Sequence, residues 1–83
     1  MKYRIKPVVI DAIQWTGYNY PEVFEFTQGK AYPTKPHSDT LFVTTLEGEM
    51  RAPKGCYIIR CANGEYCPCE ENFFNKIYEQ VKQ

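Results

Sequence analysis

Four cysteines lie within fourteen positions of this 83-residue chain, at positions 56, 61, 67 and 69. Thiols gathered this closely can bind a metal ion, form disulfides or fill a small core. Structural zinc sites usually contain C-x2–4-C pairs whose two thiolates share one ion. Cys67 and Cys69 are too close in sequence for such a pair. Cys56 and Cys61 have opposite parity in one expected strand, so they should point to opposite faces. We therefore expect reduced structural cysteines and no metal, with zinc and a disulfide as the alternatives.

The charge and hydropathy of the chain favour a cytoplasmic protein that does not bind extended nucleic acid. Ten lysines and arginines balance ten aspartates and glutamates, so no overall positive field attracts a duplex. No apolar run approaches the roughly 20 residues that cross a bilayer, and Asp11 interrupts the apolar start, which lacks a signal-peptide core. We expect no membrane association. Thiols stay reduced in the cytosol, which agrees with free cysteines.

The short chain predicts a single domain over residues 1–83 with little spare stability. A domain of this size buries only about 60% of the surface that its unfolded chain exposes. It therefore needs a dense core, cross-links, a metal or a partner subunit. Aromatic residues make up 16% of the chain, and seven of them are tyrosines, which suit both cores and interfaces. A homo-oligomer is therefore a reasonable expectation.

Aromatic and arginine residues in the expected strands form the most attractive binding set, which consists of Trp15, Arg51, Tyr57 and Arg60. The two arginines can hold a phosphate or carboxylate through two parallel hydrogen bonds. The two aromatic rings can stack on a base. The alternative is that both rings pack in the core and the arginines pair with Glu49 and Glu65.

Catalytic chemistry finds little support, and we expect no catalytic residue and no cofactor. The sole histidine, His37, lies in a proline-rich loop without a nucleophile and base arranged around it. Asp11 interrupts an apolar strand, either as a buried functional carboxylate or as a residue on the solvent face. A small nucleotide-processing enzyme that uses Asp11 or Glu65 with His37 is the enzymatic alternative.

Periodicity and turn residues predict an α+β fold. Strands are expected over residues 3–15, 41–46, 49–52, 56–61 and 65–69, with a possible short strand over 79–81. Helices are expected over 21–27 and 70–78. Residues 31–39 contain two prolines and are expected to form a loop or an irregular edge. Because the central strands form two consecutive hairpins, the fold should be a small, mainly antiparallel, curled sheet of about five strands with one or two short helices.

Several blocks of the sequence, in a fixed order, resemble one family of small proteins encoded by bacteriophages and prophages of Gram-positive bacteria. This family, of the PGDYG type, typically reads MKYRKKPVVIEAIQW, PGDYIIRG and NGEFYPC. The matching residues are Met1–Arg4, Pro7–Gly17, Glu25–Tyr32, Thr45–Ala52, Gly55, Tyr57–Arg60, Asn63–Glu65, Pro68, Cys69, Phe74, Tyr78 and Glu79. This chain departs from the pattern at Cys56, where the family has an acid, and it shares only Cys69 among its cysteines.

The resemblance implies an accessory protein that acts by binding in a host bacterial cell. Small phage proteins of this kind are expected to counter host defence by inhibiting an immune protein or by sequestering a nucleotide signal. The expected partner is therefore a host defence protein or a small nucleotide ligand. A structural or assembly factor of the virion is a further alternative.

Overall fold

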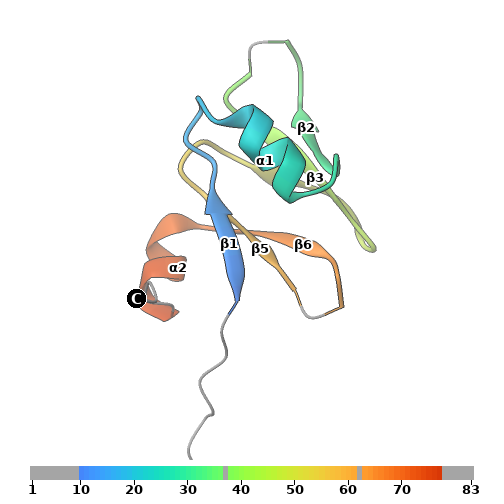
Figure 1. Ribbon diagram of the computed structural model, residues 1–83. Helices are drawn as coiled ribbons and strands as arrows, with labels where there is room; N and C mark the ends of the chain where they lie inside the picture. Colours follow the sequence, from blue (N-terminus) through green and yellow to red (C-terminus); the bar gives the residue numbers. More distant parts are fainter. Residues whose placement is uncertain (1–9, 37, 62, 78–83) are drawn as a thin grey trace, which may run out of the picture.

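Six strands and two short helices make up the computed structural model, which describes residues 10–36, 38–61 and 63–77 (Figure 1). In chain order the elements are β1 (Asp11–Gln14), α1 (Tyr20–Phe26), β2 (Ala31–Pro33), β3 (Leu41–Thr45), β4 (Gly48–Ala52), β5 (Tyr57–Arg60), β6 (Tyr66–Cys69) and α2 (Glu71–Ile77). The strands form two antiparallel sheets, ordered β1-β5-β6 and β2-β3-β4.

The predicted α+β class and antiparallel pairing are confirmed, but the strands form two small sheets rather than one curled sheet of about five. One reason is the turn after Ala52, where Pro53 cannot extend a ladder and Gly55 adopts a φ of 99°. The other is that residues 31–33, expected as part of a loop or an irregular edge, pair with β3 as an edge strand. Pro33 is tolerated there because it ends that edge strand. The expected strand residues 3–9 and 79–81 lie outside the described part of the chain.

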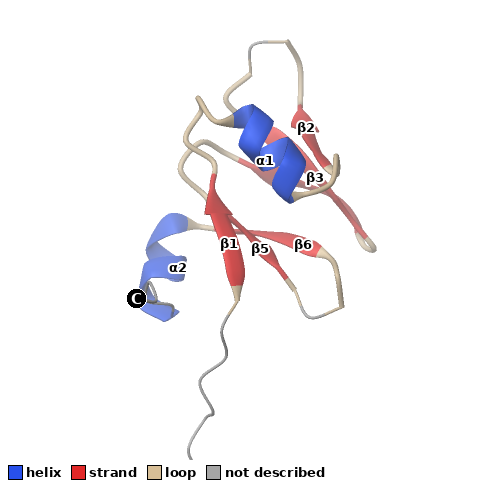
Figure 2. Ribbon diagram, viewed as in Figure 1, coloured by secondary structure: helices blue, strands red, loops and turns tan. Residues whose placement is uncertain are grey.

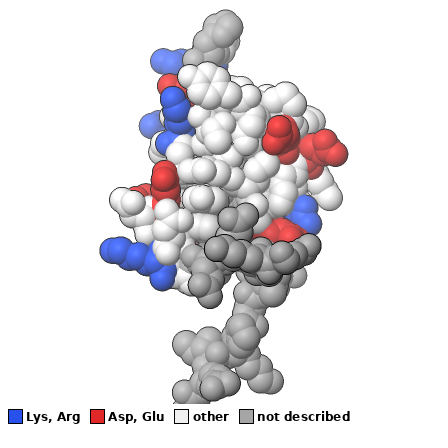
Figure 3. Space-filling view, turned by 60° about the vertical axis from the view of Figure 1, so that its left-hand side comes forward, with Lys and Arg blue, Asp and Glu red and all other residues white. Residues whose placement is uncertain are grey.

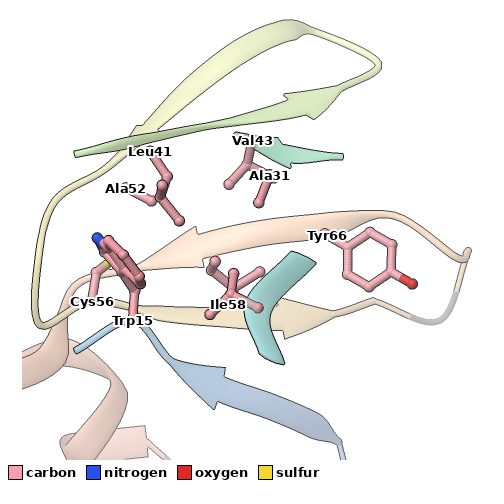
Figure 4. Close-up of a cluster of buried hydrophobic side chains, with 9 residues drawn as sticks. Trp15, Ala31, Leu41, Val43, Ala52, Cys56, Ile58 and Tyr66 are labelled. Carbon is pink, nitrogen blue, oxygen red and sulfur yellow. The ribbon is translucent and has the colours of Figure 1, made fainter. Parts of the chain in front are cut away.

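The two sheets face each other across the core, and α1 packs beside both of them (Figures 2 and 4). Strand alternation gives each sheet one apolar inner face: Leu41 and Val43 are fully buried on β3, and Ile58 is fully buried on β5. Figure 4 shows the side chains of the upper sheet pointing toward Ile58 and Tyr66. The complete buried cluster is Trp15, Val23, Ala31, Leu41, Val43, Ala52, Cys56, Ile58 and Tyr66.

A buried threonine fixes where α1 ends and β2 begins. The Thr27 hydroxyl donates to the carbonyl of Val23 at 2.9 Å and accepts from the backbone N–H of Ala31 at 3.2 Å. Thr27 has no exposed surface, so both its donor and its acceptor are satisfied within the protein. This contact sets the start of β2, and with it the position of Tyr32.

The two hairpin turns are joined although they belong to different sheets. Glu65, beside the β5–β6 turn, accepts a hydrogen bond through Oε1 from the backbone N–H of Leu46 at 2.7 Å. Leu46 lies in the turn between β3 and β4. The contact ties the tips of the hairpins together and adds to the packing between the inner faces.

Neither helix in the described ranges is long and apolar enough to cross a bilayer.

The packing between the sheets predicts that alanine substitution of two neighbouring isoleucines lowers the free energy of unfolding by very different amounts. Ile58→Ala removes a fully buried side chain from between the sheets and should lower the free energy of unfolding by about 2–5 kcal/mol. Ile59→Ala, on the opposite face, should cost about 1 kcal/mol, mainly through weaker β propensity. Urea denaturation followed by circular dichroism measures both losses. Equal losses would contradict the assignment of faces.

Candidate functional site

Trp15 is part of the core rather than a binding surface. Its side chain is 3% exposed, and its indole N–H donates to the carbonyl of Asp39 at 2.6 Å. Its backbone N–H also donates to the carbonyl of Cys56 at 2.8 Å. No face of the indole ring is open for a base, because the ring fills the space between β1 and the facing sheet (Figure 4).

Tyr57 and Arg60 contact other parts of the same domain. The Tyr57 ring stacks on Phe74 of α2 at 3.9 Å between centroids, with only 7° between the ring planes. The Arg60 guanidinium lies over Phe26 at 4.8 Å and forms an exposed ion pair with Asp11 at 3.5 Å. The interpretation of Asp11 as a solvent-face residue is thus confirmed. Arg60 pairs with Asp11 instead of Glu65.

Arg51 is the one residue of the predicted binding set that lies on an open sheet face beside aromatic side chains. Phe42 pairs directly with Tyr32 of β2 on one side and with Arg51 of β4 on the other. These three residues alternate with the buried Ala31, Leu41 and Ala52, so they lie on the face turned away from the core. We call Tyr32, Phe42 and Arg51 the outer row.

The side chains of the outer row touch one another. The Tyr32 and Phe42 rings are 5.8 Å apart with a tilt of 56°, within the range for interacting aromatic pairs. The Arg51 guanidinium lies 6.0 Å from the Phe42 ring centroid. Arg51 forms no ion pair with any residue that the structure describes. The outer row therefore offers two partly exposed rings beside a cation that has no ion-pair partner among the described residues.

Glu49 orients the tyrosine end of the outer row. The hydrogen-bonding effect of its nearby carboxylate, followed by desolvation and by the charge of Glu49, raises the pKa of Tyr32 above its usual 10.0. Thr44, opposite Glu49 in the β3–β4 ladder, also hydrogen-bonds Tyr32 and partly offsets the rise. The Glu49 carboxylate therefore interacts with Tyr32. The alternative ion pair between Glu49 and an arginine does not form among the described residues.

A shallow hollow lies next to the arginine end of the outer row. It has a volume of about 430 Å³ and lies between residues 50–56 and residues 68–72. Arg51 and Lys54 line it on one side, and Glu70 and Glu71 line it on the other. The Glu70 carboxylate is engaged with the backbone N–H groups of Asn72 and Phe73, both at 3.2 Å. The hollow therefore extends the surface that a ligand on the outer row can touch.

The arrangement of the outer row suits stacking and anion contact rather than bond-breaking chemistry. Partly exposed rings on a sheet face provide surfaces on which bases stack, and an arginine contacts phosphate in a planar geometry. Within the described ranges, no three His, Cys, Asp or Glu side chains gather closely enough to hold a metal ion. Lysines, arginines, aspartates and glutamates form small separate groups in Figure 3, with uncharged surface between them. That pattern fits a small ligand better than a long polyanion.

Sequence reasoning identified Arg51 but missed both aromatic residues beside it. Phe42 alternates with Leu41 and Val43, so its outward direction was available from parity alone. Tyr32 was missed because the prediction for residues 31–39, a loop or an irregular edge, assigned no strand register to it. The fold does not bring together the predicted set, Trp15, Arg51, Tyr57 and Arg60. Trp15 is buried in the core, and each of the other three residues contacts a different part of the domain.

Comparison with known proteins finds no matching family model, no matching curated protein and no matching solved structure.

The Tyr32–Glu49 contact makes a prediction about titration. Glu49→Gln removes the charge that favours the neutral phenol, so the pKa of Tyr32 should fall toward 10.0. NMR titration of labelled tyrosines measures the pKa, and Tyr32→Phe identifies the signal. Glu47→Gln, in the adjacent turn, serves as the control and should leave this pKa unchanged.

The sign of the accompanying stability change follows from linkage. Because the folded pKa lies above the unfolded value, the contact stabilises the fold below pH 10.0 and is lost as the pH rises through the folded pKa. An unchanged Tyr32 pKa in Glu49→Gln would show that the carboxylate does not contact the phenol in solution.

Proposed function

We propose that this protein is a non-enzymatic binding protein that holds a nucleotide-type ligand on the outer row. In the setting implied by the resemblance to phage and prophage proteins, it sequesters a host nucleotide signal and so counters host defence. The observation that carries the proposal is the alignment of Tyr32, Phe42 and Arg51 directly across three strands on an open sheet face.

The first support is energetic. Stacking of one base on an aromatic side chain contributes about 1–3 kcal/mol, and the outer row provides two adjacent rings. Arg51 stands beside Phe42 without an ion-pair partner in the described part of the chain, so it can pair with a phosphate at little cost. Together these contacts are enough for a small ligand with one base and one phosphate group.

The second support is the rigidity of the outer row. Its rings lie on paired strands rather than on loops, and the two rings pack against each other. Groups that are already ordered lose little conformational entropy when a ligand binds. The hollow beside Arg51 leaves space for a sugar, whose hydroxyl groups can donate to the carboxylates of Glu70 and Glu71.

The alternatives have weaker support. The carboxylate of Asp11 is exposed and paired with Arg60, and Glu65 accepts hydrogen bonds at the joined hairpin turns. Both carboxylates therefore have structural partners, and His37 lies outside the described residues. An assembly role in the virion would place the protein in purified particles, where mass spectrometry would detect it.

Calorimetry against cyclic mononucleotides, cyclic dinucleotides and ADP-ribose derivatives tests the proposal. We expect at least one of these ligands to bind, and Phe42→Ala to weaken it about 5- to 150-fold, as the loss of one stacking contact implies. Arg51→Ala should weaken binding and reduce its dependence on salt. Leu46→Ala removes an exposed side chain, 86% accessible, from the same hairpin and should leave affinity unchanged.

Two results would count against the proposal. Absence of binding by every ligand in the panel, with defence still suppressed in cells, would assign a protein target instead. Equal loss of affinity in Phe42→Ala and Leu46→Ala would move the site away from the outer row. Thermal melts of each variant separate lost binding from lost folding.

A further inference from the structure

Two of the four cysteines lie in contact on the β5–β6 hairpin. Cys61 follows β5 directly, and Cys67 pairs with Ile59 in the ladder, so the two cysteines are diagonal neighbours across the strands. Their sulfur atoms are 3.0 Å apart. Both residues are free thiols and partly buried, on the face opposite the buried Ile58.

The other two cysteines have different surroundings. Cys56 is buried in the core cluster, on the opposite face from Cys61, as strand parity predicted. The Cys69 thiol contacts the backbone carbonyl of Glu70 at 3.7 Å. Among the four cysteines, all of which the structure describes, Cys61 and Cys67 are the pair whose sulfur atoms are in direct contact.

A disulfide between Cys61 and Cys67 needs only a small movement. The S–S bond is about 2.05 Å long, so the sulfur atoms must approach by about 1 Å. The pair closes a ring across the turn at Asn63 and Gly64, where Gly64 has a φ of 85°. Because the strands are already paired, closing the ring requires no new chain folding.

We propose that Cys61 and Cys67 form a reversible dithiol–disulfide site whose oxidant is a low-molecular-weight disulfide. The Cys61 thiolate attacks one sulfur of the oxidant, forms a mixed disulfide and releases the first half as a thiol. Cys67 then loses its proton, attacks the Cys61 sulfur and releases the second half as a thiol. The net reaction converts two protein thiols and one small disulfide into one protein disulfide and two small thiols.

The surroundings of Cys67 set the rate of ring closure. Burial, followed by the hydrogen bond and charge of Cys61 and the charges of Glu65 and Glu47, raises the pKa of Cys67 to about 11. The Cys67 thiolate is therefore scarce at neutral pH, which slows its attack on the mixed disulfide. Ring closure should accelerate as the pH rises toward that value.

The cross-link would reinforce a part of the fold that joins both sheets. It would bridge the hairpin whose Glu65 holds the backbone of Leu46 in the other hairpin. A short closed loop removes conformations from the unfolded chain, so the melting temperature should rise by about 10–20 °C on oxidation. This effect is separate from ligand binding on the outer row.

The test treats the purified full chain with bis(2-hydroxyethyl) disulfide and follows its intact mass. We expect the mass to fall by two hydrogen atoms, peptide mapping to place the bond between Cys61 and Cys67, and dithiothreitol to restore both thiols. Cys67→Ser should instead accumulate a mixed disulfide at Cys61. Cys69→Ser is the matched control and should form the same internal bond as the natural chain.

Three outcomes would overturn the inference. These are a stable mixed disulfide on the natural chain without loss of two hydrogens, a bond that maps to Cys56 or Cys69, and a bond between two chains. If Cys67→Ser does not fold, as judged by circular dichroism, Cys61→Ser keeps the Cys67 thiol, which should form a mixed disulfide more slowly because its pKa is raised. Peptide mapping of the natural chain shows which two cysteines are joined, and this result does not depend on either variant.

Discussion

The burial of one face of each three-stranded sheet against the other is the constraint on which this structure depends. Leu41 and Val43 of one sheet and Ile58 of the other are completely inaccessible, and they meet with Val23 of α1. A strand has two faces, so placing these residues inside places every alternate residue outside. A register shift by one residue would exchange the two sets and expose the core.

Both sites of interest are consequences of this constraint. The outer row exists because Phe42 alternates with two core residues and because both neighbouring strands are in register with it. The contact between Cys61 and Cys67 exists because both have the parity opposite to Ile58 on a tightly turned hairpin. The same packing thus produces an aromatic face on one sheet and a thiol pair on the other.

A small domain with limited core volume uses much of its aromatic content for its own stability. Trp15 fills the space between elements, and Tyr57 holds α2 through Phe74. Tyr66 is buried beside Phe26, with Arg60 over both rings. Tyr32 and Phe42 differ from these rings because they lie side by side on the outward face of paired strands and remain partly exposed.

The sequence alone determined the local elements. Glycine turns flanked by alternating apolar residues identified both hairpins, and Pro21 with acidic residues in the first turns located the helices. It also determined that Cys56 and Cys61 face opposite ways, because parity is a property of a single strand. The α+β class followed from these local signals.

Only the tertiary structure decided which residues meet. Division into two sheets depends on the pairing of Ala31–Pro33 with a strand eight residues away, and no local signal required that pairing. The neighbours of Arg51 and the 3.0 Å approach of Cys61 and Cys67 depend on strand register, which the packing of the core selects. The sequence by itself therefore determined the direction of each strand residue, while the packing of the two sheets decided its neighbours.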